Sequence, residues 1–440
     1  MYCTESASGM LELFRFRRDP IAYVGDIGRR SVDIRAIRVG SRHIFVVNQP
    51  ELIRDILITH DWNFVKGPGL RSSKPVLGNG LLTSEGELHR RQRRLVQPAF
   101  HSARLASYAE TMVQCAVIQC ESWNPGSEYF LDEQMMRLTL QIVGRTLFSA
   151  DMQDEAAEVG KSLKRALSVF VALNNPLAQL LAPVRGWARR KAARSRQEIE
   201  ALLSKVINAH RKAPEAYDDM FSMLLRSHDE SGAGYMSNEL LLDECLTLFL
   251  AGHETTANAL VWTWYLLSQH PEMVAKLEAE LESVLIGRLP TLEDVPALKY
   301  IGQVLRESMR LYPPAWMIAR DAVTAYRLGD VDAPQGSTFM MSPYATQRDP
   351  RFWEKPEVFD PERWAADATS ARSSFNYYPF GAGTRVCIGE HFAMMEGVLL
   401  IATLAQRWRF TLVDGQQITP WPRITLRSRR PMAFTLTRRD

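Results

Sequence analysis

Several features are scarce in this sequence of 440 residues, and their scarcity excludes whole classes of protein. There are five cysteines, Cys3, Cys115, Cys120, Cys245 and Cys387, and none of them forms a Cys-x-x-Cys pair. A disulfide scaffold needs a denser, even set of cysteines, and a zinc site needs closely spaced pairs. The sequence therefore predicts free thiols in a reducing compartment, the cytoplasm.

The sequence also contains no segment with the composition of a linker between domains. No stretch is Pro-rich, Gly/Ser-rich or a long block of one charge, and the chain contains no internal repeat. Length alone allows about two to four domains, but nothing marks a boundary. We therefore expect one domain over residues 1–440, and a monomer. The 53 basic and 50 acidic residues leave a net charge of +3, which is too balanced to predict a nucleic-acid partner.

Membrane-anchoring segments are missing as well. Residues 1–18 contain neither a signal-peptide core nor a spanning segment, and Phe14 and Phe16 alternate with arginines, so no membrane anchor is expected. Residues 246–267 are apolar enough to resemble a span. They include His253, Glu254 and Asn258, which are costly in lipid. A helix buried in a large protein core fits this segment better.

Helical patterning dominates what is present. It covers residues 50–58, 108–123, 133–147, 195–211, 272–284 and 390–406. Strand-like segments occur at 34–39, 44–48 and 322–343, with turn signals between them. The expected fold class is mainly α with minor β, with small β-rich parts near residues 30–50 and 322–343.

The most informative segment is residues 380–389, Phe-Gly-Ala-Gly-Thr-Arg-Val-Cys-Ile-Gly. Gly381 and Gly383 allow a tight loop and a close approach of backbone to a flat ligand. Cys387 lies just before a predicted helix, whose N-terminal partial charge lowers a thiol pKa and favours the thiolate. Such a thiolate can bind a soft metal centre, and Arg385 can reach an anionic group of the same ligand. The alternative is a buried free cysteine beside a glycine turn.

This segment resembles the haem-binding signature of the cytochrome P450 family, with Phe380, Gly383, Arg385, Cys387 and Gly389 at its five fixed positions. The resemblance extends from about residue 20 to the C-terminal end and is closest to soluble bacterial members. It implies the cytochrome P450 fold, a single large haem-enclosing domain. It also implies that heme b (iron protoporphyrin IX) is the cofactor, that the five fixed positions of this segment help to hold it, and that Cys387 is the iron ligand.

A second motif is Glu307 and Arg310, three residues apart on one face of a predicted helix. An exposed pair of this kind has little energetic value. The resemblance implies more, because the family has a Glu-x-x-Arg pair about this far upstream of its cysteine, joined by an arginine from a later loop. Arg363 is the expected third member, and the role of the set would be structural. Gln347 departs from the family by replacing a frequent His.

A third motif is His89 and Arg93, four apart and therefore on one helix face. The resemblance implies that both bind haem propionates, together with Arg320 and Arg385. Buried anions need paired cations, so three arginines and one histidine suit two carboxylates. We expect Arg90, Arg91 and Arg94 to lie on the solvent-exposed face of this helix.

Residues 251–256, Ala-Gly-His-Glu-Thr-Thr, interrupt the apolar helix. Gly252 costs about 1 kcal/mol relative to alanine there, which suggests a function such as a groove for dioxygen. Thr255 is expected to bond back to the carbonyl of Ala251. Glu254 and Thr255 form an acid–alcohol pair suited to relaying protons, the catalytic role that the family gives to these positions. The alternative is a set of polar side chains satisfied within the core.

The resemblance implies a monooxygenase that uses two electrons and two protons to place one atom of dioxygen in a C–H or C=C bond, the other leaving as water. The chain has no recognisable flavin, NAD or iron–sulfur module, so a separate ferredoxin or flavodoxin must supply electrons. Arg90, Arg91 and Arg94 would suit an acidic partner. Two alternatives stay open. A peroxygenase would usually lack the Glu–Thr pair, and a haem-binding sensor without turnover would not need it.

By resemblance, the substrate contacts residues 64–82, 169–181, 246–255, 313–318 and the turn near Ile424. Trp316 is bulky and expected near the haem face, which suggests a shaped hydrophobic substrate. Terpenoid, fatty-acid-like and steroid-like molecules all fit, and some similar bacterial members oxidise terpenes. The predicted apolar lining consists of Leu250, Ala251, Ala315, Trp316, Met317 and Ile318.

Overall fold

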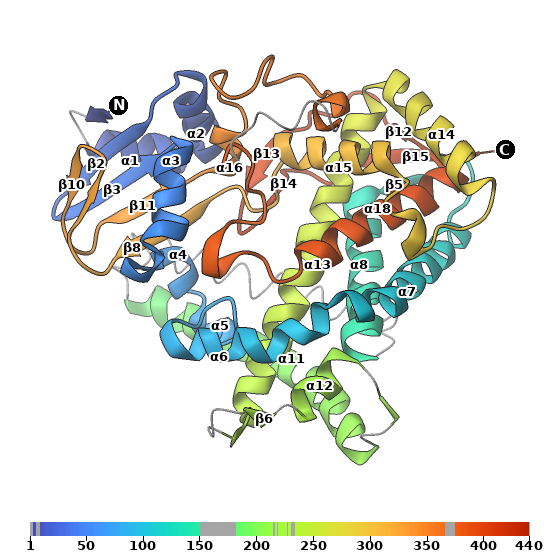
Figure 1. The fold of residues 1–440 in the computed structure, drawn as a ribbon, viewed down its shortest axis with the longest axis horizontal. Coiled ribbons are helices and arrows are strands. Elements are labelled where there is room, and N and C mark those ends of the chain that lie inside the picture. Colours follow the sequence, from blue (N-terminus) through green and yellow to red (C-terminus); the bar gives the residue numbers. More distant parts are fainter. Residues whose placement is uncertain are drawn as a thin grey trace.

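The structure is a computed structural model that describes residues 3–5, 9–149, 182–213, 216–217, 219–226, 228–229, 234–365 and 375–439. Helices dominate it and strands are few (Figure 1), which confirms the mainly α class with minor β. The helices are α1 (Gly9–Arg18), α2 (Pro20–Arg29), α3 (Pro50–Arg54), α4 (Pro68–Arg71), α5 (Lys74–Leu77), α6 (Gly86–Val96), α7 (Ser102–Glu121), α8 (Leu131–Phe148), α11 (Ala182–Lys212), α12 (Met220–Arg226), α13 (Asn238–Ser268), α14 (Pro271–Leu285), α15 (Lys299–Leu311), α16 (Pro343–Thr346) and α18 (Glu390–Arg407).

The largest sheet has the strand order β1-β2-β3-β11-β8-β4. It joins the two regions in which strands were expected, because β11 pairs in parallel with β3 and antiparallel with β8. Its strands are β1 (Cys3–Glu5), β2 (Ile34–Val39), β3 (Arg42–Val47), β4 (Phe64–Lys66), β8 (Ile318–Ala322) and β11 (Thr338–Met341).

The remaining strands form smaller sheets. They are β5 (Glu128–Phe130), β6 (His228–Asp229), β7 (Gly234–Tyr235), β9 (Tyr326–Leu328), β10 (Val331–Ala333), β12 (Trp408–Leu412), β13 (Pro420–Pro422), β14 (Leu426–Ser428) and β15 (Ala433–Arg438). The β12-β15-β5 sheet lies near the C-terminus (Figure 1), and the β13–β14 hairpin contacts α2 and α13.

Helix α13 runs through the middle of the molecule (Figure 1), and 22 of its residues are buried. Ser237 caps it by accepting a hydrogen bond from the Leu240 N–H at 3.2 Å. On its α8 side, Thr139 Oγ1 donates to the carbonyl of His253 at 3.0 Å, and a Cβ added to Gly252 would lie 3.0 Å from Val143 Cγ2. Gly252 therefore permits close packing against α8, and the dioxygen groove expected from the sequence stays a prediction. None of the described helices is long and apolar enough to cross a bilayer.

Candidate functional site

The loop before α18 is fixed by its own backbone and by a distant helical turn. The Cys387 N–H donates to the carbonyl of Phe380 at 2.9 Å, and Gly381 turns the chain with φ +72°. Gly383 has φ +69°, and a Cβ there would lie 1.9 Å from the carbonyl oxygen of Leu57. A side chain at residue 383 would therefore displace this loop, because it packs against residues 55–59. The close approach predicted for Gly383 is thus made to protein backbone.

Cys387 differs from Cys115, Cys120 and Cys245 in its exposure to solvent. Its side chain is solvent-accessible, whereas the other three are buried. Although the residue reaches solvent, the surrounding loop excludes most water from the Cys387 thiol, and this desolvation raises its pKa; the Gly389 N–H and Arg93 oppose the shift only in part. The helix-terminal effect predicted from the sequence is present but is outweighed by desolvation. A bound metal ion reverses that balance by stabilising the thiolate.

Helix α6 supports this loop directly. Arg93 Nη1 donates to the carbonyl of Val386, the residue before the cysteine, at 2.8 Å. From the loop, Arg385 Nη1 donates to the carbonyl of Ser84 at 2.8 Å, and its guanidinium pairs with Glu85 at the start of α6. The structure therefore brings Arg93, Arg385 and Cys387 together, although the sequence separates the first from the other two by almost 300 residues.

His89 and four basic side chains gather beside this loop, and burial is the main reason why their pKa values are lowered. Burial lowers the pKa of His89 to about 3, and the charges of Arg385, Lys66, Arg93 and Arg320 add to that shift. Burial and then Arg385 lower the pKa of Lys66 to about 7 and that of Arg320 to about 10. Nearby carboxylates offset the excess only in part. The cluster is therefore suited to receive anionic groups of a ligand.

Lys66 is the member of this cluster that sequence reasoning missed. It ends β4, where it lies directly across from Arg320 of β8 in the sheet register. Its side chain is 5% exposed, and Nζ donates to the carbonyls of Leu81 and Leu82. The available signal was a lysine in the strand-like run Phe64–Lys66, followed by Gly67-Pro68, but a lone lysine before a turn normally indicates a solvated surface.

On α13, accessible and buried positions alternate around the residues predicted to be catalytic. Ala251 is exposed and Thr255 half-buried, although Leu250 and His253 next to them are buried. Thr255 Oγ1 donates to the carbonyl of Ala251 at 2.7 Å, as expected. Ala251 and Thr255, four residues apart, therefore form an accessible strip on a helix that is otherwise mostly buried.

Glu254 points elsewhere. It is 2% exposed and accepts a hydrogen bond from Thr425 Oγ1 at 2.6 Å, and Thr425 in turn accepts one from Asn258 Nδ2 at 3.0 Å. The acid and the alcohol of the predicted pair thus have different hydrogen-bond partners. Glu254 is connected to the turn near Ile424, one of the regions expected to contact substrate.

The predicted apolar lining divides into two groups. Ala315, Met317 and Ile318 are half-buried, and Ile318 Cδ1 lies 3.7 Å from the position of a Cβ on Gly381. Trp316 is only 8% exposed, packs with Ile21, Val24, Ala345 and Leu426, and donates its indole N–H to the carbonyl of Arg423 at 2.9 Å. This packing gives Trp316 a structural role behind the accessible residues. The predicted contacts at residues 169–181 lie outside the described residues.

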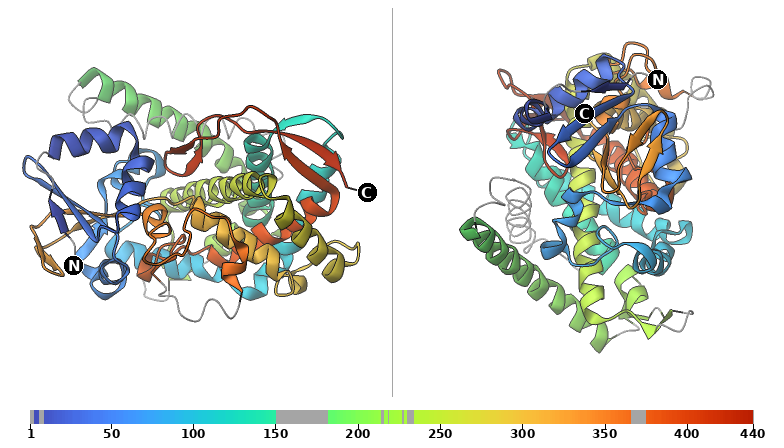
Figure 2. Two further views of the ribbon diagram at one scale, coloured as in Figure 1. Left: turned by 90° about the horizontal axis from the view of Figure 1, so that it is seen from above. Right: turned by 90° about the vertical axis from the view of Figure 1, so that its left-hand side faces the viewer.

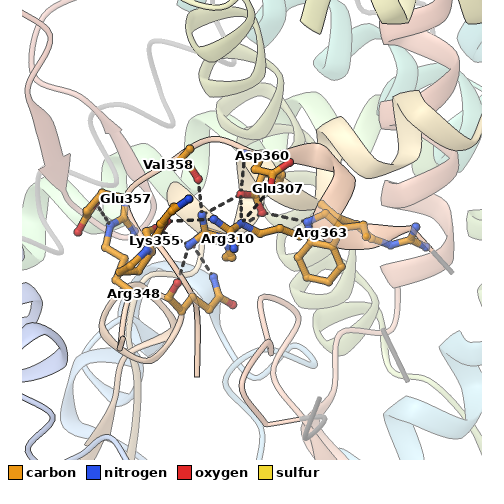
Figure 3. Close-up of polar contacts among 12 residues, drawn as sticks. Glu307, Arg310, Arg348, Lys355, Glu357, Val358, Asp360 and Arg363 are labelled. Atoms are coloured by element: carbon orange, nitrogen blue, oxygen red, sulfur yellow. Dashed lines mark hydrogen bonds and ion pairs between the residues drawn. The ribbon is translucent and has the colours of Figure 1, made fainter. Parts of the chain in front are cut away.

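The Glu307–Arg310 pair is fully buried. Arg310 donates to both carboxylate oxygens of Glu307 at 2.8 Å, and also to the carbonyls of Gln347, Pro356 and Val358 at 2.7–3.0 Å. Figure 3 shows Glu307 between Arg310 and Arg363, whose Nε lies 3.3 Å from Glu307 Oε1. The expectation of a surface pair of little value does not apply, since both partners are 0% exposed.

Comparison with known proteins agrees with this geometry. The sequence matches the family model described as Cytochrome P450 over residues 10–433. The chain belongs to the cytochrome P450 family. Among its relatives are the cyclooctatin synthase of Streptomyces melanosporofaciens, 36% identical over 93% of this chain and 89% of that protein, and the pentalenene oxygenase of Streptomyces avermitilis, 32% identical over 97% and 94%. A cyclooctat-9-en-7-ol 5-monooxygenase of S. melanosporofaciens is 34% identical over 90% and 86%.

As a member of the cytochrome P450 family, this protein is an oxidoreductase that incorporates oxygen from dioxygen, and its cofactor is heme b. The residues present fit that group in two respects. Cys387 stands exposed on the loop before α18, and beside it lies a cluster of four basic side chains and His89, whose pKa values are lowered mainly by burial. The thiol would bind the haem iron as a thiolate. The basic side chains would pair with the two propionate carboxylates of the haem.

Proposed function

We propose that this P450 hydroxylates a terpenoid, with Cys387 as the iron ligand. The proposed substrate class rests on relatives that align with most of this chain and whose names specify pentalenene and cyclooctat-9-en-7-ol. The apolar character of Leu250, Ala251, Met317 and Ile318 supports it, because a hydrocarbon skeleton is bound mainly by burial of apolar surface. Fatty-acid-like and steroid-like molecules are the competing substrates.

The proposed roles follow from position and charge. Heme b, once bound through the thiolate, supplies the activation of dioxygen. Phe380 and Gly389 bracket the cysteine, and His89, Arg93, Arg320, Arg385 and Lys66 hold the propionate carboxylates. Thr255 delivers protons from the accessible strip of α13, and Glu254 is the acid behind it. Glu307, Arg310 and Arg363 hold the core. We further propose a single domain that acts as a monomer in the cytoplasm.

The test compares the wild-type protein with Thr255→Ala and Thr256→Ala. Bound cyclic terpenoids should shift the iron spin state of all three proteins, since neither hydroxyl is needed for apolar binding. In ¹⁸O₂ with a surrogate electron donor, the wild-type product should carry one labelled atom. Thr255→Ala should consume electrons while forming about tenfold less product, because the positioned proton donor is gone. Thr256, buried and directed at the carbonyl of Gly252, is the matched control.

Equal coupling in the two threonine variants would remove Thr255 from proton delivery. A spin-state shift caused by fatty acids but by no terpenoid would overturn the substrate class. Product formed with hydrogen peroxide alone, at the rate seen with the electron donor, would replace the monooxygenase by a peroxygenase. A protein that binds haem and forms no product under either condition would be a sensor.

We propose that a ferredoxin or flavodoxin donates the electrons and docks on α6. Arg90 and Arg94 are exposed there, and both approach Glu87, at 2.5 and 3.7 Å, so the net charge of this face is smaller than the sequence indicates. Arg91 is half-buried. Even so, Arg90 and Arg94 directly follow His89 and Arg93 on α6, which would keep a docked donor close to the haem.

Reversing charge at Arg90 and Arg94 together, each to Glu, should slow reduction by an acidic donor about tenfold at low salt, because like charges meet on encounter. The difference should shrink at high ionic strength. Stopped-flow reduction measures both effects. Arg327→Glu is the control, since its side chain is equally exposed, at 68% against 71% for Arg90, but lies on β9. Equal slowing in all variants would mean that the donor docks elsewhere.

A further inference from the structure

Two adjacent acidic residues of α13 hold the loop formed by residues 78–82. The Asn79 N–H donates to Asp243 Oδ2 at 2.7 Å, and the Leu81 N–H donates to Glu244 Oε2 at 2.9 Å. Both acids are buried, at 2% and 0% exposed. A carboxylate that accepts a backbone N–H makes a charge-assisted hydrogen bond, which is stronger than a bond between neutral groups. The loop is therefore fixed to α13 at two alternate residues.

Glycine at residues 78 and 80 lets this loop approach α13 closely. A Cβ added to Gly78 would lie 2.0 Å from Asp243 Oδ1, and one added to Gly80 would lie 2.1 Å from Thr247 Oγ1. The Cβ on Gly80 would also lie 2.5 Å from the carbonyl oxygen of Asp243, which belongs to the helix backbone. A side chain at residue 80 would therefore lift the loop away from the helix.

A buried cation holds the same loop from another element. Lys66 Nζ of β4 donates to the carbonyl of Leu81 at 2.9 Å. The N–H and the carbonyl of this one residue are thus bound by Glu244 and Lys66, an acid and a base. Gln92 of α6 adds a bond from Nε2 to the carbonyl of Asn79 at 2.7 Å. Three elements, β4, α6 and α13, therefore fix one short loop.

Asp243 extends this network to α11. Arg196 Nη2 donates to Asp243 Oδ1 at 2.6 Å, and Arg196 Nε donates to Glu200 at 2.6 Å. Helices α5, α11 and α13 contact one another, and the right view of Figure 2 shows α11, in green, running obliquely past the lower part of α13. The loop, α11 and α13 are therefore joined at the Asp243 carboxylate.

The loop covers the face of α13 that leads to the accessible strip. Ala251 and Thr255 follow Glu244 by seven and eleven residues, about two and three full turns, so the three residues lie on one helix face. At a rise of about 1.5 Å per residue, Ala251 is about 10 Å along the helix from Glu244. The loop also belongs to residues 64–82, a region expected to contact substrate.

We propose that Glu244 is a positioning residue for substrate, which keeps the loop of residues 78–82 in place as one wall of the apolar pocket. This inference rests on the proposed function, because it takes the substrate to be apolar and bound beside this loop. A loop that is already fixed does not have to be ordered when substrate binds, and the cost of such ordering is subtracted from affinity. Only the ionised carboxyl holds the Leu81 N–H at full strength.

Glu244 changes its charge near neutral pH. Burial raises the pKa of Glu244 to about 7, the Leu81 N–H opposes the rise, Asp243 adds to it and Lys66 opposes it. Asp243 and Lys66 are thus the charged groups, among the described residues, that act on this carboxyl. Lys66 is itself faced by Arg385, Glu85 and Arg320. Because the ionised form holds the loop, the hold is complete above this pKa and weakens as the pH falls through it.

Hydrogen exchange of the full-length, haem-loaded protein tests the hold directly. In the wild type, protection of the amides of residues 79–82 should fall about fivefold as the pH drops from about 8 to about 6, after correction for the intrinsic exchange rate. Glu244→Gln should show the lower protection at both pH values, because its amide cannot ionise. Glu244→Ala should lose at least about tenfold, because the Leu81 N–H then has no acceptor.

Substrate binding is measured on the same proteins from the iron spin-state shift with pentalenene and with dodecanoic acid. Whichever probe binds the wild type should bind Glu244→Ala at least about tenfold more weakly. Imidazole, a small ligand that binds the iron directly, should bind both proteins equally. A shift with dodecanoic acid alone would overturn the terpenoid substrate and would still test the loop, so the two proposals fail separately.

Glu396→Gln is the matched control. Glu396 is also 0% exposed, and burial raises its pKa to about 8, but it lies on α18 and faces Thr256. Its substitution should change neither measurement, and the carbon-monoxide spectrum shows that each variant still holds haem. Wild-type protection in Glu244→Ala would overturn the proposal. So would a pH dependence that persists in Glu244→Gln, or a loss of protection in Glu244→Ala that leaves probe binding unchanged.

Discussion

Serine in place of Cys387 is expected to remove the strongly red-shifted Soret band of the reduced, carbon-monoxide-bound protein. That band reports thiolate ligation, and a serine hydroxyl stays protonated and donates little electron density. Product formation should fall at least about a thousandfold, since the thiolate is what favours cleavage of the O–O bond. Some haem should remain bound, because the cluster around Arg93 and Arg385 is unchanged.

Absorption spectroscopy and product analysis check this result. Cys120→Ser is the matched control, because burial raises the pKa of the Cys120 thiol to about 12 and the residue packs in the main core. Its spectrum should equal that of the wild type. A normal Soret band in Cys387→Ser, or its loss in Cys120→Ser, would overturn the assignment of Cys387.

Arg310→Met is expected to cost about 3–5 kcal/mol of the free energy of unfolding, because it leaves the buried carboxylate of Glu307 without its bidentate partner. The carbonyls of Gln347, Pro356 and Val358 lose a donor at the same time. Since proteins are stable by only about 5–15 kcal/mol, the haem content of the purified variant should fall sharply. Arg310→Lys should fail similarly, since one ammonium cannot reproduce the planar fork.

Arg288→Met provides the control for this network. Arg288 makes an equally good bidentate pair with Asp294, both contacts at 2.6 Å, but its side chain is 54% exposed. Its loss should lower the free energy of unfolding far less than Arg310→Met does, because solvent screens an exposed ion pair. Adding Glu307→Gln to Arg310→Met should recover part of the stability, because the buried carboxylate that lost its bidentate partner is replaced by a neutral amide. Chemical denaturation measures the free energy of unfolding of the wild type and of the four variants. An Arg310→Met protein as stable as the wild type would contradict the structural role.

The sequence predicted helices well where apolar residues recur at helical spacing, and less well where they do not. The helix expected at 390–406 is α18, Glu390–Arg407. The helix expected at 195–211 begins at Ala182, because its first part is arginine-rich and offers no apolar period. Strand pairing was harder still. β15 pairs with β5 about 300 residues away, and the order β3-β11-β8 depends on contacts that no local pattern encodes.

Among the site residues, those in dense motifs were predictable and those defined by packing were not. Cys387 and Arg385 belong to one ten-residue run, and the structure places them against Arg93 and Glu85. Lys66 was missed because its burial arises only from pairing with β8. Trp316 was expected at the pocket because the resemblance places residues 313–318 there, and its contact with substrate stays a prediction. The hydrogen bond from its indole N–H to the carbonyl of Arg423 could not be predicted, because no local pattern links the two residues.

The contact between Glu85 and Arg385 also bears on when the protein can take up its cofactor during synthesis. The two residues are 300 positions apart, and at about 5–20 residues per second the ribosome needs roughly 15–60 s to travel from one to the other. During that interval Lys66, His89 and Arg93 have already been made, but the cysteine that would hold the iron has not. With Cys387 as the proposed iron ligand, stable haem binding would be one of the last events in the synthesis of this protein. A nascent chain that stalls before the cysteine loop would then expose Lys66 and Arg93 without an anionic ligand to neutralise them.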